Sequence, residues 1–440
     1  MTQIHCAGLG PRLTLVLIFL TPALLLSVPH GGNAAFFLLF LASLWGLWIN
    51  RPTPRQDSSP GAHLTIALLI APIIAVAMGQ LLRGDLIIKE FDAPSRLLAA
   101  TAIFLWLSRV QLSPAAIANA LGLGAAAGLI LLTQFLSERW MSHYGGRFST
   151  EMSAPNDFGG YVGILMTLAT TLLITTKWER SRANFGGRLL LLAGFAAGLW
   201  LILGSQSRGP WLATGVSLVF LLFLSLWIDQ RRGLALILGA FLSIGLTLQL
   251  PQFSGLKDRL TSTIQEPIAW LQDGQRDTSG GTRLSMIPAS IELFQTQPLS
   301  GFGDFGYSPL ARTEGFKQKF GNSTSDQLGG EGGPHNELAA RSLQSGVWGL
   351  AATLLLLIAP VVLFAQRLLK DFRTNSSPST SLMGLGFAIN IFLLSFVLEP
   401  YSLKHTATFN ALLLAVLLST QVSTSSRLRQ SSDSPAKKPA

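Results

Sequence analysis

A single histidine stands among small polar residues where it could carry acid–base chemistry. His335 lies in the run Gly-Gly-Glu-Gly-Gly-Pro-His-Asn-Glu, residues 329–337, just before a long apolar stretch. An imidazole titrates near neutral pH and is the commonest general base, so it could deprotonate a hydroxyl group here. The alternative is an ordinary surface histidine in a glycine-rich loop. The other five histidines lack the spacing of metal ligands, and the sequence predicts neither a metal site nor a cofactor.

Two arginines have surroundings that favour binding of an anion. Arg208 lies in Gly-Ser-Gln-Ser-Arg-Gly-Pro-Trp, residues 204–211, a polar break between two apolar stretches, and its small neighbours leave room for a ligand. Arg283 follows Ser-Gly-Gly-Thr, residues 279–282, at the expected start of a helix, where free backbone N–H groups also attract anions. A guanidinium group binds phosphate oxygens through paired hydrogen bonds. The simpler interpretations are an Arg208 that snorkels to the membrane surface and a solvated or salt-bridged Arg283.

The segment Gly-Phe-Gly-Asp-Phe-Gly, residues 301–306, formally matches the glycine pattern of dinucleotide-binding folds. That pattern requires a preceding strand and a following helix, whereas here it follows Gln297 and Pro298 in a polar insert. These glycines are therefore expected to form tight turns. The chain also lacks an Asp-x-Asp motif and a phosphate-binding P-loop, so nothing supports cytoplasmic nucleotide chemistry.

The composition places these residues in an integral membrane protein. Of the 440 residues, 49% are hydrophobic and only 12% are charged, whereas soluble domains carry about 25% charged residues. The net charge of +10 fits basic loops on the cytoplasmic side better than a nucleic-acid partner. The single cysteine, Cys6, cannot form an internal disulfide.

About twelve apolar stretches approach the length of about 20 residues that a helix needs to cross a bilayer. The fourth stretch has the weakest pattern, and the first is expected to be a retained span, because a second apolar run follows at once without a cleavage pattern. The stretches lie near residues 12–28, 34–49, 62–82, 96–111, 114–136, 157–176, 186–204, 209–228, 233–250, 342–365, 382–399 and 406–420.

The distribution of basic residues predicts the topology. With both ends in the cytoplasm, twelve spans leave most Lys and Arg residues on the cytoplasmic side, as basic loops require. The predicted organisation is spans 1–9 in residues 1–250, an extracytoplasmic loop domain at 251–341, spans 10–12 in 342–422 and a cytoplasmic tail at 423–440.

The long polar insert is expected to fold on the membrane surface, because structureless loops of such length are uncommon. Leu256–Leu271 has the apolar spacing of an amphipathic helix. Thr282 is expected to cap a second helix that runs to Gln295, and Pro288 is expected to kink or interrupt it.

Several short motifs, in this order, resemble the O-antigen ligase/polymerase family, and within it the lipopolysaccharide O-antigen ligases. The resemblance spans most of the chain, and it is the order of the motifs that makes it specific. One departure is Gln344, where many relatives carry an acidic residue. The motifs are Ala-Pro-Asn-Asp-Phe-Gly-Gly-Tyr at 154–161, Ser-Gln-Ser-Arg-Gly-Pro-Trp at 205–211, Pro-Leu-Ser-Gly-Phe-Gly-Asp at 298–304, and Pro-His-Asn-Glu-Leu at 334–338 followed by Gly-Val-Trp-Gly at 346–349.

The resemblance implies a GT-C-like, all-α polytopic glycosyltransferase. Such an enzyme would move O-antigen glycan from undecaprenyl pyrophosphate to lipid A-core at the periplasmic face of the bacterial inner membrane, without a metal and with inversion. Its partners would be these two lipid-linked substrates and membrane lipids. The resemblance places Arg208 and Arg283 on pyrophosphate-binding arginines and His335 on an essential histidine, and we expect Asn156 and Asn336 to contact substrate.

Three other functions remain open from the sequence. An O-antigen polymerase would share the donor and the topology but extend one lipid-linked glycan with another. A protein O-oligosaccharyltransferase is expected to have a larger C-terminal extracytoplasmic part. A secondary transporter would need polar groups near the bilayer midplane, usually in repeated halves, whereas the polar positions here gather at one predicted membrane face.

Overall fold

The structure is a computed structural model that describes residues 9–49, 60–110, 112–176, 182–249, 256–330, 332–402 and 404–432. Within these ranges the elements of secondary structure are helices, joined by turns and short links, and the one β-type pairing is an isolated bridge between Thr150 and Ser153. The predicted all-α polytopic class is confirmed. In chain order the elements are α1 Leu9–Leu24, α2 Gly31–Ile49, α3 Pro60–Arg83, η1 Ile88–Phe91, α4 Asp92–Arg109, α5 Pro114–Leu132, α6 Glu138–His143, α7 Pro155–Thr175, α8 Arg182–Ser205, α9 Arg208–Ile228, α10 Gln230–Leu248, α11 Leu256–Asp273, α12 Ser279–Thr296, α13 Ser308–Ala311, α14 Glu314–Phe320, α15 Asn322–Gly329, α16 Glu337–Arg373, α17 Ser379–Leu394 and α18 Lys404–Ser432.

Every apolar stretch expected to span the membrane coincides with a helix. Among the described residues, seven helices are long and apolar enough to cross a bilayer, namely α2, α3, α5, α7, α8, α9 and α16. Four shorter apolar helices lie in α1, α10, α17 and α18. The remaining expected span, residues 96–111, overlaps α4 and contains Arg96 and Arg109, which explains its weak apolar pattern.

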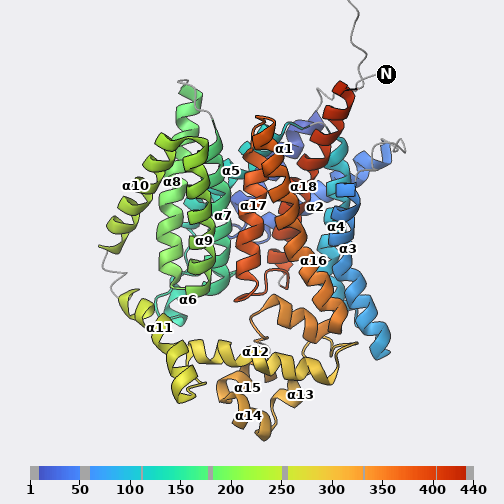
Figure 1. The fold of residues 1–440 in the computed structure, drawn as a ribbon, viewed down its shortest axis with the longest axis vertical. Coiled ribbons are helices and arrows are strands. Elements are labelled where there is room, and N and C mark those ends of the chain that lie inside the picture. The colour runs from blue at the N-terminus through green and yellow to red at the C-terminus, as the bar shows by residue number, and fades with distance from the viewer. Residues whose placement is uncertain are drawn as a thin grey trace, which may run out of the picture.

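Helix α7 forms the centre of the bundle. It is buried along almost its whole length, as expected for a helix that is apolar on all sides. Helices α5, α8, α9 and α17 pack around it. Glycines allow the close approach to α9, because a Cβ atom at Gly163 would collide with Thr214. On the other side of the molecule α18 packs against α4, and α16 packs against α3 and α17 (Figure 1).

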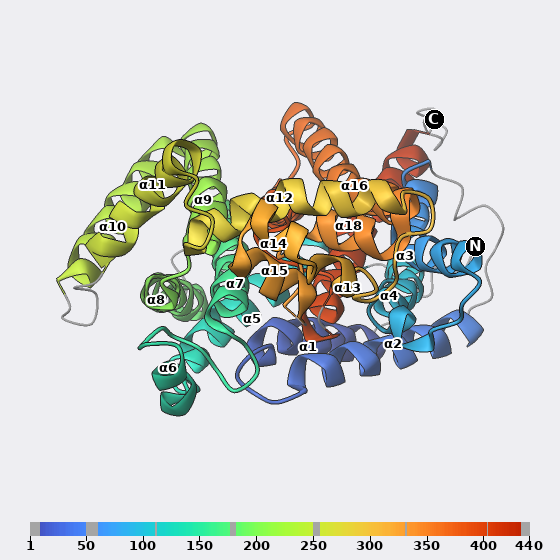
Figure 2. The ribbon, with the colours of Figure 1, turned by 90° about the horizontal axis from the view of Figure 1, so that it is seen from below.

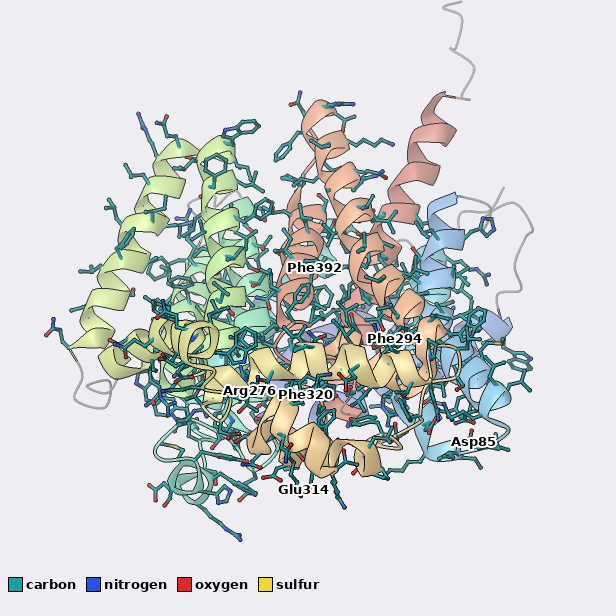
Figure 3. All side chains as sticks on the ribbon, turned by 60° about the horizontal axis from the view of Figure 1, so that its bottom comes forward. Asp85, Arg276, Phe294, Glu314, Phe320 and Phe392 are labelled. Atoms are coloured by element: carbon teal, nitrogen blue, oxygen red, sulfur yellow. The ribbon has the colours of Figure 1, made fainter. Side chains whose placement is uncertain are left out.

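One end of the bundle is covered by residues 256–330, which we call the cap. Helix α12 runs crosswise beneath the vertical helices, with α13, α14 and α15 below it, while α18 ends on the opposite side (Figure 1). Seen from the cap side, α12 crosses between the α9 side and the α16 side of the bundle (Figure 2). The cap has its own apolar core, to which Phe320 and the partly buried Phe294 contribute from α14 and α12 (Figure 3).

Two expectations for the insert need correction. The amphipathic helix is confirmed as α11, but Thr278 rather than Thr282 caps α12, since its Oγ1 accepts a hydrogen bond from the Gly281 N–H at 3.0 Å. The helix begins four residues earlier than expected, and Thr282 donates back to the Thr278 carbonyl from inside it. Pro288 does not interrupt α12, because it lies on an exposed side where water can bond to the carbonyl that loses its helical donor.

Candidate active site

The turn between α8 and α9 brings Arg208 to the cap end of the bundle. Gln206 has a positive φ of 48°, so the chain reverses within a few residues. The Ser207 hydroxyl donates to the Pro155 carbonyl at 2.8 Å and ties the turn to the start of α7. A Cβ atom at Gly209 would lie 2.6 Å from Val397 Cγ2, so the first turn of α9 packs directly on the segment after α17. The position of Arg208 is therefore fixed from two sides.

The Arg208 guanidinium is held by a carboxylate of the cap. Its Nη1 and Nη2 donate to the two oxygens of Glu266 in α11 at 3.0 and 2.9 Å, and Nη2 also donates to the Ser262 hydroxyl. Glu266 Oε2 accepts a further bond from the Gly280 N–H at 2.6 Å, in the first turn of α12. Hydrogen bonding to Arg208 is the largest effect on the pKa of Glu266 and lowers it. One carboxylate thus joins α9, α11 and α12.

Arg283, by contrast, has no ion-pair partner among the described residues. It lies in α12, one turn after Gly280, and its side chain is half-buried. Its guanidinium makes no hydrogen bond or ion pair to any residue in the described ranges. Burial, and then the charge of Arg208, lower the pKa of Arg283. A half-buried charge without a partner is costly, so this position favours an anionic ligand.

A third arginine, which the sequence did not single out, lies beside the α8–α9 turn. Arg147 Nε donates to the Ser205 carbonyl at 3.0 Å, and its Nη2 donates to Asn156 Oδ1 at 3.0 Å and to the Ser207 hydroxyl at 2.8 Å. Its spacing in the sequence gives no signal, because only folding brings the link before α7 against the start of α9. Asn156 is therefore part of the site through Arg147.

Positive charge accumulates at this point. Burial lowers the pKa of Arg147 to about 10, with further contributions from the charges of Arg259, Arg283 and Arg208. We call these four residues the arginine cluster. Within the described residues, the ion pair of this cluster is the one between Arg208 and Glu266. The cluster thus keeps a surplus of positive charge, which a multiply charged anion would neutralise.

His335 lies at the same end of the bundle, in the turn that precedes α16. Its φ is 48°, and its backbone N–H donates to Glu399 Oε1 at 3.0 Å, in the segment after α17. Burial, and then the charge of Arg283, lower the pKa of His335. The imidazole is therefore mostly neutral at pH 7 and able to accept a proton.

The backbone beside His335 is held by buried polar residues. Arg341 Nε donates to Glu337 Oε1 at 2.7 Å, and Glu337 Oε2 accepts from the Tyr401 N–H at 2.9 Å. Burial, followed by the charge of Glu337, raises the pKa of Glu399 to about 7. Asn336, expected to contact substrate, caps α16, since its Oδ1 accepts from the Ala339 N–H at 3.1 Å. This cap, the Arg341–Glu337 ion pair and the bond to Tyr401 fix the direction in which α16 leaves the His335 turn.

The glycine motif at 301–306 forms turns, as expected. These turns pack against α16 at the point where the helix is interrupted. Ser345 and Gly346 have non-helical backbone angles, and at Gly346 φ is 63° and ψ is −146°. The Phe302 and Gly303 N–H groups donate to carbonyls of the first half of α16, and the Val347 N–H donates to the Pro298 carbonyl at 2.8 Å. Two of the sequence motifs, 298–304 and 346–349, thus form one structural unit.

Replacing Gly346 by alanine should destabilise the protein strongly. Its backbone conformation alone costs a residue with a side chain about 1–3 kcal/mol. The new Cβ would also lie 2.6 Å from the carbonyl carbon of Leu299. We expect a clearly lower melting temperature in detergent for Gly346→Ala. Gly315→Ala in α14 is the matched control, because no atom lies within 4 Å of its added Cβ. Equal melting temperatures of the two variants would show that position 346 tolerates a side chain.

Fold and site together define a polytopic helical membrane protein that gathers arginines and a neutral histidine at one end of its bundle. Residues 193–354 match the family model described as O-antigen ligase. An uncharacterized protein of Haemophilus influenzae is 25% identical over 367 residues, which cover 81% of this chain and 85% of the relative. The resemblance to the O-antigen ligase/polymerase family is thus confirmed over the segment that contains Arg208, Arg283 and His335, and it implies lipid-linked glycan substrates.

Proposed function

We propose that this protein is an O-antigen ligase that transfers O-antigen glycan from undecaprenyl pyrophosphate to lipid A-core. The observation that carries the proposal is the arginine cluster, with its surplus positive charge and its open Arg283, beside a histidine that is neutral at pH 7. In the proposed orientation the cap faces the periplasm, both termini lie in the cytoplasm, and the membrane is the bacterial inner membrane.

The arginine cluster would stabilise the leaving group. Transfer breaks the bond between the anomeric carbon of the glycan and the diphosphate oxygen, and the electron pair leaves with the diphosphate. Negative charge therefore grows on the diphosphate in the transition state, where guanidinium groups already in place stabilise it. In this mechanism arginines do the work that a metal ion does in many nucleotide-sugar enzymes, so transfer should persist in a chelator.

His335 would activate the acceptor. Its neutral imidazole takes the proton from a sugar hydroxyl of the lipid A-core while the hydroxyl oxygen forms a new bond to the anomeric carbon. Attack from the side opposite the diphosphate inverts the anomeric centre. Burial, and then the charge of Arg283, lower the pKa of His335 and favour the unprotonated imidazole before the reaction.

A reconstitution experiment tests the proposal. Purified protein is supplied with undecaprenyl-pyrophosphate-linked glycan and lipid A-core, in the presence of EDTA and without nucleotide. We expect glycan to become attached to lipid A-core at a rate that is proportional to the enzyme concentration. Longer lipid-linked glycan without attachment to lipid A-core would instead identify a polymerase of the same family, and no change in either lipid would overturn both assignments.

A further inference from the structure

Arg147 is a member of the arginine cluster for which the sequence predicts no function, and only part of its guanidinium is hydrogen-bonded. All of its hydrogen bonds use Nε and Nη2. Within the described residues Nη1 has no hydrogen-bond partner, and it is not among the buried side-chain atoms that lack one. One edge of the guanidinium is therefore fixed to the protein, while the other is accessible.

The acceptors of Arg147 place this accessible edge beside the predicted anion-binding arginines. Two of them, the Ser205 carbonyl and the Ser207 hydroxyl, belong to the turn that ends at Arg208. Burial is the largest cause of the lowered pKa of Arg147, and the charges of Arg259, Arg283 and Arg208 add to it, in agreement with these contacts. Glu266 binds both Nη atoms of Arg208, whereas Nη1 of Arg147 and the guanidinium of Arg283 have no hydrogen-bond partner in the described part of the chain.

If Arg147 only supported the α8–α9 turn, its positive charge would not be needed. The same hydrogen bonds to Ser205, Ser207 and Asn156 could be made by neutral donors, without the repulsion from three other arginines. Burying several like charges together is unfavourable unless a counter-charge is bound. Glu266 compensates part of this repulsion through Arg208, and a bound anion would compensate the rest.

We propose that Arg147 is a third anion-binding arginine, which contacts the diphosphate group through its Nη1 edge together with Arg283. This inference rests on the proposed function, because the diphosphate belongs to the lipid-linked donor. Asn156, Ser205 and Ser207 then act on the diphosphate indirectly, by orienting Arg147. The ligand class is a diphosphate ester, and the glycan itself makes no part of this contact.

Binding of inorganic pyrophosphate to the purified full-length protein in detergent tests the inference without requiring transfer. A ligand that binds the folded state raises its melting temperature in proportion to its affinity. We expect Arg147→Gln to weaken pyrophosphate binding by about 10-fold to 100-fold, and Arg147→Lys to have an intermediate effect, since lysine keeps the charge but loses the planar fork. Arg139→Gln is the matched control, because Arg139 is exposed on α6 and forms no ion pair with described residues.

The outcomes separate the two hypotheses. If the wild type binds pyrophosphate and Arg147→Gln binds it equally well, Arg147 is only structural, even if the variant melts at a lower temperature. If the wild type does not bind pyrophosphate at all, the proposed function fails together with this inference. A loss of binding in Arg147→Gln that Arg139→Gln does not show supports the proposal, provided that transfer shows a raised KM for the lipid-linked donor and an unchanged KM for the acceptor.

Discussion

Arg283→Ala should lower the rate of glycan transfer by about 100-fold to 1,000-fold, which is the usual cost of removing one group that stabilises developing negative charge. The variant should fold normally, because Arg283 makes no hydrogen bond or ion pair to the described residues that the substitution would break. Initial transfer rates and melting temperatures of the purified proteins measure the two effects separately.

A second substitution at this position separates charge from geometry. Arg283→Lys keeps the positive charge but cannot bind two phosphate oxygens in parallel, so its rate should fall between those of the wild type and Arg283→Ala. Wild-type transfer by Arg283→Ala would remove Arg283 from the mechanism. A low melting temperature for the same variant would reveal a structural function that its open guanidinium does not predict.

His335→Ala should lower transfer by about 100-fold to 10,000-fold, as expected when a general base is lost. The wild-type transfer rate should also fall at low pH. Burial and Arg283 lower the pKa of His335 below its ordinary value of 6.5, so the imidazole accepts protons from acceptor hydroxyls at neutral pH. As the pH falls through this lowered pKa, the base becomes protonated and the rate should fall about tenfold per pH unit. We call this fall in rate at low pH the acid limb. The residual rate of His335→Ala should lack it.

Glu399 provides the control for that assignment. Its pKa is raised to about 7, so its carboxylate titrates close to the range of the imidazole. Glu399→Gln removes this titration while keeping a side-chain oxygen that can accept the His335 N–H. If the acid limb disappears in Glu399→Gln and persists in the low rate of His335→Ala, then the carboxylate, and not the imidazole, is the essential base.

Much of the architecture follows from apolar length alone. A stretch of about 20 apolar residues has few alternatives to a membrane helix, so the positions of the helices could be predicted from the sequence. The exact start of a helix in the cap is a local choice, and there the prediction failed: Thr278 and Thr282 are equally good capping residues by type, and the helix begins after Thr278. The long-range partners of the site, such as Arg147 and Glu266, leave no local signal at all.

The unusual residue at position 344 has a structural explanation. Gln344 lies at the break in α16, where its Oε1 accepts from Arg341 Nη1 at 2.7 Å and its Nε2 donates to Asp304 Oδ1 at 2.6 Å. An acidic residue here would meet the Asp304 carboxylate with no proton between the two oxygens. The amide satisfies a cation on one side and an anion on the other, which only a side chain that both donates and accepts can do.

The carboxylate of Glu266 already occupies the kind of place that a phosphate oxygen prefers, between the fork of an arginine and the first turn of a helix. The protein therefore places a carboxylate of its own where Arg208 would bind a phosphate oxygen. A diphosphate that engages Arg208 must compete with this tethered carboxylate, and any such exchange loosens the link from α9 to α11 and α12. Binding of an anion at Arg208 would therefore also change how tightly the cap packs on the bundle.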